Sequence, residues 1–331
     1  MAIDGTADAL GFATRGSIGD DGTMLWPFGS TWRPVRQTRR GTVDLWWLTA
    51  RMWTTKWYPQ GIDLGVWDGR RALAVSWFRQ DKDRQHLASR ISLIDLERSR
   101  HLDIALAIDD GGGELAPAPI HAGGLAWFED RLFVAATGQG VWEFDLAAIR
   151  RVRGSLARRL TGGHRRGLPA VALVAVRSRV HSTDLRCSFL GRVFDEAGEP
   201  LQRVLIGEYR TDDEGRVGEF SIPHGPDDGF DCHDEIAPSI PRMQGAVRWG
   251  DRYFVSQSSG PKRPGTLWRG ARDALQPDGI PLPVGCEDLA LDPEARMLWS
   301  LGEHPWRRVV RGIPFAWVGL RAQQPGDTTV D

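Results

Sequence analysis

The stretch QGIDLGVWDGRRALAVSW, at residues 60–77, sets a pattern that recurs along the chain. A polar residue and a glycine come first, followed by an apolar run, a turn rich in Asp, Gly and Arg, and a second apolar run. Variants of it are GGLAWFEDRLFVAAT (123–137), QGAVRWGDRYFVSQS (244–258), EDLALDPEARMLWSLGE (287–303) and, more loosely, RCSFLGRVFDEAGEPLQRVLIGEY (186–209). Two apolar runs around a turn are typical of a β-hairpin, so the sequence predicts five related hairpins.

A third apolar segment follows each hairpin. These segments are ISLIDL (91–96), VWEFDL (141–146), RVGEFSI (216–222), TLWRG (266–270) and RVVRGIPF (308–315). A repeated hairpin with a further strand is typical of a blade of a β-propeller. We therefore expect an all-β chain, residues 1–331, that forms one propeller of five blades. Six blades is the alternative, if residues 8–50 form a degenerate blade.

The outer strands can be predicted from the remaining apolar segments. HLDIALAI at 101–108 and the end of HRRGLPAVALVAV at 164–176 should complete the first two blades. A strand from TVDLWWLTARMW, at 42–53, should complete the last blade, so that residues 1–40 form an N-terminal extension and closure region and 322–331 a polar tail. Closure of this kind removes exposed sheet edges. Only 146–160 has helical potential.

Composition excludes several classes of partner. The 331 residues carry a net charge near −1 with both signs dispersed, which favours neither nucleic acid nor an anionic membrane. The basic run at 150–159 is interpreted as a solvated face, and most of the 15 tryptophans as packing between blades. The three cysteines show no CxxC spacing, and Cys187 and Cys286 are interpreted as core thiols. The first residues lack the pattern of an export signal, so we expect a cytoplasmic protein.

Propeller geometry predicts where a site would lie. Residues just before each first strand and just after each second strand should converge on one mouth of the central channel. The first set is Gln60, His121, Gln244, Glu287 and Asp288, and the second is Trp77, Thr137, Glu208, Gln257, Glu303 and His304. These amides, imidazoles and carboxylates predict a site for a small-molecule ligand or substrate.

Roles can be suggested for the members of this set. His121 is the candidate general acid or base, with Glu287 and Glu303 as charge partners. Gln60 and Gln244 would orient the ligand, although tying neighbouring blades together is an equally good role for them. Glu208, His304, Asp288 and Trp77 are the remaining candidate ligand contacts. Of the adjacent pair Glu287 and Asp288, we expect only one to face the channel, because neighbouring side chains on a strand point to opposite sides. Glu287 is the better candidate because it matches Gln60 and Gln244, and the other residue would cap a loop or an adjacent strand.

Metal binding and glycoside hydrolysis are weaker hypotheses. The carboxylates of the mouth could hold Ca²⁺, but no strict metal-ligand spacing is present. The acidic segment DDGFDCHDEIAP at 227–238 fits a solvated loop better than a metal site. A glycosidase would need two carboxylates flanking one bond, for which Glu287 and Asp63 are poor candidates.

Several phrases resemble a family of actinobacterial proteins that are usually secreted and expected to be propeller-like. They are LIGEYR (205–210), MQGAVRWGDRYFVSQSSGPKRPGTLWRG (243–270) and CEDLALDPEARMLWSLGEHPWRRVV (286–310), with PQGID (59–63) and HAGGLAWFEDRLFVA (121–135). The resemblance implies the fold but no activity, and the missing export signal suggests a cytoplasmic role such as biosynthesis. The blade phrase alone is also similar to gluconolactonase and strictosidine-synthase-like propellers, which act at the channel mouth. Fold analogy does not fix function.

Two functions remain open from the sequence. One is an enzyme that uses acid/base or electrostatic catalysis for hydrolysis, elimination or cyclisation, because no Ser-His-Asp spacing supports a covalent mechanism. The other is a ligand- or protein-binding module without turnover. A protein-binding face would need exposed aromatic side chains near the loops, for which Trp306 and Phe315 are the candidates.

Overall fold

The structure is a computed structural model that describes residues 33–37, 41–46, 52–96, 100–109, 111–161, 171–225 and 227–320. Within these ranges the chain is almost entirely β-structure, with a single eight-residue helix, α2 (Gly154–Thr161). No helix in the described ranges has the length and apolar character needed to cross a membrane. The expectation of an all-β chain is confirmed.

The strands form groups of four, each running antiparallel from the axis outward. The first group is β3 (Trp57–Trp67), β4 (Arg70–Gln80), β5 (His86–Asp95) and β6 (Arg100–Asp109). The second is β8 (Leu125–Phe128), β9 (Arg131–Ala135), β10 (Val141–Asp145) and β12 (Val171–His181). The third is β13 (Phe189–Phe194), β14 (Pro200–Gly207), β15 (Val217–Ser221) and β16 (Asp231–Ile236).

The last two groups follow the same order. The fourth is β17 (Met243–Trp249), β18 (Arg252–Gln257), β19 (Pro264–Gly270) and β20 (Gln276–Val284). The fifth is β21 (Cys286–Asp292), β22 (Met297–Gly302), β23 (Val309–Pro314) and β2 (Val43–Trp46), with β1 (Arg33–Gln37) beyond it. Every predicted hairpin and third strand is present. Strand β2 pairs with β23.

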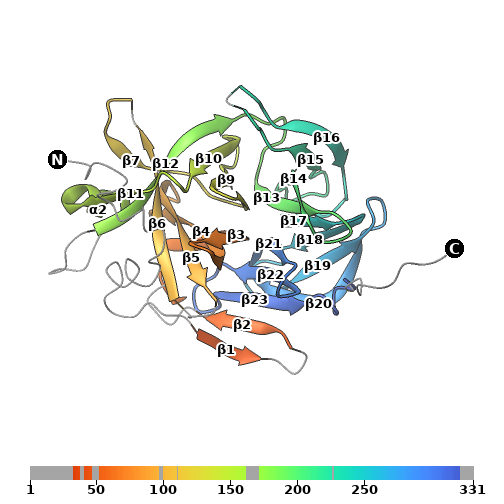
Figure 1. The fold of residues 1–331 in the computed structure, drawn as a ribbon. Helices are drawn as coiled ribbons and strands as arrows, with labels where there is room; N and C mark the ends of the chain where they lie inside the picture. Colours follow the sequence, from red (N-terminus) through yellow and green to blue (C-terminus); the bar gives the residue numbers. More distant parts are fainter. Residues whose placement is uncertain are drawn as a thin grey trace.

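The first strands of the five groups surround one axis (Figure 1). Each contacts the next in the order β3, β8, β13, β17 and β21, and β21 in turn contacts β3. Glycine permits this close approach. A Cβ atom on Gly61 would lie 2.8 Å from the backbone of Gly124, and one on Gly245 would lie 2.7 Å from the backbone nitrogen of Leu289. The repeated glycines therefore allow the first strands to pack closely at the crowded axis.

Large apolar side chains fill the space between neighbouring groups. Trp67 and Trp127 belong to one buried cluster, and Trp77 belongs to a second. Serine hydroxyls add polar links between groups: Ser76 donates to the carbonyl of Ala122 at 2.7 Å, and Ser256 donates to the carbonyl of Glu287 at 2.7 Å. Packing and hydrogen bonds thus fix the first strands relative to one another.

Three segments differ from the sequence-based expectations. The acidic segment 227–238 contains a strand, β16, which forms the outer edge of the third group. The basic run divides into β11 (Arg150–Arg153) and α2, whose buried residues are Ala157 and Leu160. Strand β12 is longer than one group requires, and its first half pairs with β11 and, in parallel, with β6. Most of the segment 8–50, which the six-blade alternative would use, and residues 164–170 lie outside the described residues.

Candidate functional site

Two carboxyl groups of the fifth group are held by amides of neighbouring first strands, in a cluster that we call the mouth after its predicted position. Gln60 in β3 donates through Nε2 to Oε2 of Glu303 at 3.1 Å. Gln244 in β17 donates through Nε2 to Oε1 of Glu287 at 3.3 Å. Both carboxyls belong to the fifth group, so the amides reach it from either side. The structure therefore brings together four of the predicted site residues. The two amides position the carboxyls and, at the same time, link neighbouring groups of strands, which are the two roles suggested for them.

The two carboxyls differ in their access to solvent. Glu287 is 2% exposed, and burial, with repulsion from Glu303 and Asp288, raises its pKa well above the usual range. The side chain of Glu303 is 23% exposed. Burial raises the pKa of Glu303 to about 7, against the opposing effects of the Gln60 hydrogen bond and the charge of Arg308. A pKa of about 7 allows Glu303 to change its protonation state near neutral pH.

Arg308 bonds the backbone of Glu303, one member of this pair, and the sequence analysis did not predict it as a site residue. Its side chain is fully buried; Nε donates to the carbonyl of Glu303 at 2.8 Å and a terminal nitrogen donates to the carbonyl of Trp57 at 2.6 Å. Burial lowers its pKa to about 10, so it remains cationic at neutral pH. Arg308 lies at the start of an apolar segment, where the sequence pattern gives no sign that an arginine turns inward.

Aromatic and imidazole rings form one wall of the mouth. Nδ1 of His121 lies 3.2 Å from Nε2 of His86, so one imidazole donates to the other. The ring of Phe78 stands 4.5 Å from that of His121 and 5.4 Å from that of Tyr58. Burial, with the nearby His86 and Arg186, lowers the pKa of His121 to about 4. His121 is therefore neutral at neutral pH, and it is a weaker base than the sequence analysis expected.

Arg308 contacts both this wall of rings and the carboxyl pair. The guanidinium of Arg308 lies 5.2 Å from the ring centre of Tyr58, while its Nε bonds the backbone of Glu303. His304 completes this side of the mouth, with Nδ1 3.6 Å from Oε1 of Glu303. Burial and the charges of Arg308 and Arg307 lower the pKa of His304. The imidazole therefore favours its neutral form beside the carboxyl.

Asp288 has a different role from the one expected. Its Oδ2 accepts from the backbone nitrogens of Ile62, at 3.1 Å, and Leu125, at 3.3 Å, on two other first strands. The pairing of β21 with β22 shifts register between Cys286 and Leu289. Side chains in this irregular stretch need not alternate strictly between the two faces of the sheet. Asp288 therefore reaches across the axis and caps two other first strands, which fits the cap expected of one member of the pair but not the role of ligand contact. Asp63 acts similarly by accepting from the nitrogen of Trp127 at 2.6 Å.

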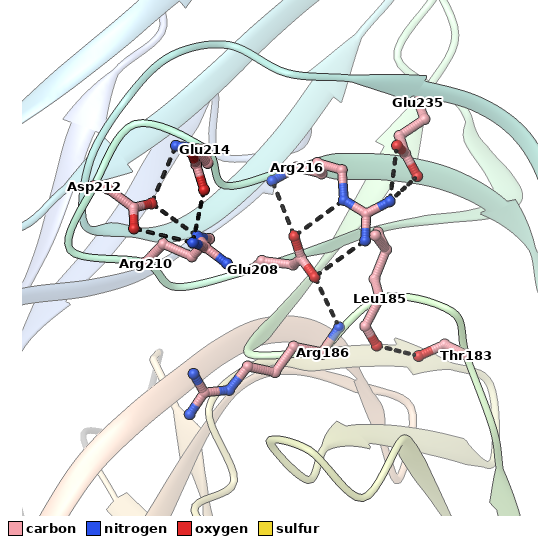
Figure 2. Close-up of polar contacts among 9 residues, drawn as sticks. All are labelled: Thr183, Leu185, Arg186, Glu208, Arg210, Asp212, Glu214, Arg216 and Glu235. Carbon is pink, nitrogen blue, oxygen red and sulfur yellow. Dashed lines mark hydrogen bonds and ion pairs between the residues drawn. The ribbon is translucent and has the colours of Figure 1, made fainter.

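Glu208 is engaged by an arginine and by backbone groups (Figure 2). Its Oε2 accepts from Nε of Arg216 at 3.2 Å, and its Oε1 accepts from the backbone nitrogen of Arg186 at 3.2 Å. Although burial alone would raise it, these contacts lower the pKa of Glu208. The side chain of Arg186 points away from this network in Figure 2. Glu208 thus fixes the loop before β13, and no ligand is needed to pair its charge.

Three other expectations are revised by burial and pairing. Trp77, a candidate ligand contact, is 0% exposed and packs in the core. The amide oxygen of Gln257 accepts from the indole of Trp268 at 2.9 Å. Phe315, a candidate exposed aromatic, is 2% exposed, whereas Trp306 is 71% exposed. The prediction of core thiols is confirmed, since Cys187 and Cys286 are buried free thiols, and Cys232 is exposed.

A metal site is not formed by the side chains that the structure describes. Within the described ranges, no group of three or more His, Cys, Asp or Glu residues is arranged to hold a metal ion. The carboxyls of the mouth are instead satisfied by amides, as in Gln60–Glu303 and Gln244–Glu287. The arrangement suits proton transfer by Glu303, with neutral polar groups around it to bind a ligand.

Comparison with known proteins gives similarity in structure only. No protein-family model matches the chain, and no curated protein matches it. Among solved structures, it is similar to a gluconolactonase of Xanthomonas campestris, at 13% identity and a TM-score of 0.41, over 86% of this chain and 94% of that one. It is also similar to a GH43_1 enzyme of Xanthomonas citri, at 11% identity and a TM-score of 0.41, over 81% of this chain and 90% of that one. A third similar structure is a glutaminyl cyclase of Myxococcus xanthus, at 10% identity and a TM-score of 0.39, over 79% of this chain and 92% of that one. Similarity at this level assigns no activity to the chain.

Proposed function

We propose that the chain is a five-bladed propeller, completed by β2, whose channel mouth is the active site of a small-molecule enzyme. Proton transfer by Glu303 is the central step, and hydrolysis, elimination or cyclisation are the reactions it suits. The single observation that carries this proposal is the pair of buried carboxyls held by Gln60 and Gln244, one of them accessible and with a pKa near 7. A group that titrates near the working pH can both accept and donate a proton.

In the hydrolysis of a lactone, ionised Glu303 would take a proton from an attacking water and later return it to the leaving alcohol. The new bond joins the water oxygen to the carbonyl carbon, and the ring C–O bond breaks. Glu287, protonated and buried, would keep the mouth from accumulating a second negative charge. His121 and His304, both neutral, would hydrogen-bond the ligand. The catalytic role suggested for His121 thus passes to Glu303.

A panel of lactones, followed by a panel of 4-nitrophenyl glycosides, tests this proposal by proton or chromophore release. We expect Glu303→Gln to lower kcat by about 10²- to 10⁴-fold while leaving the fold intact, as judged by circular dichroism. Glu294→Gln is the matched control, because the side chain of Glu294 is 73% exposed. Turnover that survives Glu303→Gln would remove the assigned role.

Binding without turnover is the second candidate, and one observation favours it. The rings of Trp53 and Trp306 stack with centroids 5.4 Å apart, although both side chains are largely exposed. Trp306 lies three residues after Glu303 and adopts a φ of 67°, which is unusual for a bulky residue. A ligand that binds tightly, is never turned over and is lost with Trp306→Ala would support this alternative.

A further inference from the structure

A hollow of about 340 Å³ lies between the third and fourth groups of strands, away from the mouth. It is lined mainly by charged and polar residues of β14, β15, β16, β17 and β18 and of the turns that follow β17 and β19. Strand β17 begins next to the mouth, at Gln244, and reaches the hollow near its other end, at Arg248. The hollow is large enough for a small organic ligand.

The hollow is lined by charged groups of both signs, and most of them form ion pairs with one another. Oε1 of Glu219 accepts from Arg203 at 3.0 Å and from Arg248 at 2.9 Å. Arg272 donates to Oδ2 of Asp234 at 2.7 Å. These pairs hold three guanidinium groups in place around one concave surface. Because the signs are balanced, a ligand with a single charge would be repelled by part of the lining.

Two buried groups of the lining keep unused hydrogen-bonding capacity. Glu219 is 6% exposed, and among the described residues its Oε2 accepts no hydrogen bond. Tyr253 is also 6% exposed, and its hydroxyl has no protein partner in the described part of the chain. Both residues line the hollow, so these two oxygens can accept a hydrogen bond from a ligand that enters it. At the rim, Arg203 and Arg272 are about half exposed and have further N–H groups to offer a carboxylate.

We propose that this hollow binds a small zwitterion of the α-amino-acid type. Its ammonium group would donate to Oε2 of Glu219 and to the hydroxyl of Tyr253, and its carboxylate would accept from Arg203 and Arg272. Such a ligand has no net charge but matches both signs of the lining, and its side chain would project toward the open side. The site is separate from the carboxyl pair of the mouth and does not depend on the function proposed there.

Calorimetric titration of the full chain tests this inference with glycine, L-alanine and L-leucine, each compared with its N-acetyl and methyl-ester derivatives. We expect the free amino acids to bind and each derivative to bind at least tenfold more weakly, because one of the two charges is lost. Tyr253→Phe, which removes only the hydroxyl, should weaken binding several-fold. Absence of binding for all three amino acids, or equal binding of the derivatives, would overturn the proposal.

Variants locate the binding. Glu219→Gln should weaken binding at least tenfold, and Arg272→Gln, at the exposed rim, provides a second test if the Glu219 variant fails to fold. Arg263→Gln is the matched control, since Arg263 is exposed and outside the lining. Glu303→Gln should leave amino-acid binding unchanged. Binding that is lost with Glu303→Gln but kept with Arg272→Gln would assign the ligand to the mouth and contradict the inference.

Discussion

The carboxyl pair of the mouth and the carboxyls deeper along the axis are chemically alike but are held in different ways. Asp288 and Asp63 accept from backbone nitrogens of neighbouring first strands. Glu287 and Glu303 accept from the side-chain amides of Gln244 and Gln60. Burial raises the pKa of all four. A raised pKa therefore does not identify a functional carboxyl by itself. The type of donor distinguishes the two regions, and access to solvent sets Glu303 apart from the other three carboxyls.

The largest effect on stability should come from Asp288→Ala. This change leaves the backbone nitrogens of Ile62 and Leu125 buried without an acceptor, at a cost of roughly 2–4 kcal/mol in the free energy of unfolding. Urea denaturation measures it. Asp288→Asn keeps an acceptor and should cost clearly less. If both variants unfold like the wild type, Asp288 does not hold the first strands together.

Close packing at the axis gives the next largest effect. Gly245→Ala would place a Cβ atom 2.6 Å from Oδ1 of Asp288, so we expect a loss of about 1–3 kcal/mol in the free energy of unfolding. Gly229→Ala is the matched control, because a Cβ atom there meets nothing within 4 Å. Equal stability of the two variants in thermal denaturation would show that the axis has room to relax.

A smaller effect appears in the dependence of stability on pH. The folded-state pKa values of Asp63 and Glu303, about 6 and about 7, exceed their ordinary values, so the folded chain binds more protons than the unfolded chain in this range. The free energy of unfolding should therefore fall as the pH rises from about 4 to about 7. Urea denaturation at several pH values measures this slope. Asp63→Asn and Glu303→Gln should each flatten it; an unchanged slope would contradict the raised pKa values.

The smallest expected effect is a change in the pKa of Glu303, and it tests whether the amides of Gln60 and Gln244 act on different carboxyls. Gln60→Leu removes a hydrogen bond that lowers the pKa of Glu303, so this pKa should rise. Gln244→Leu is the control, because its amide contacts Glu287 instead. Carbon-13 NMR of labelled glutamate side chains can follow both. A shift of Glu303 that is the same in the two variants would show that the amides do not act separately.

Periodicity predicted the strands well because each hairpin carries its own turn residues and apolar runs. The repeat also located Gln60, Gln244, Glu287 and Glu303 at one mouth, since their positions follow from where strands begin and end. It could not foresee the inward turn of Arg308, nor the irregular ladder that sends Asp288 across the axis. Those features depend on contacts between distant strands. The outer strand β16 was missed because polar residues dominate an exposed edge.

The most direct test of the account is an NMR titration of the carboxyl carbon of Glu303, assigned by comparison with Glu303→Gln. We expect a midpoint near pH 7 for Glu303 in the folded chain, and a midpoint for Glu287 well above its ordinary value. A midpoint for Glu303 at the ordinary value, near 4.5, would contradict the account, because the mouth would then hold a permanently ionised carboxylate unable to donate a proton at neutral pH.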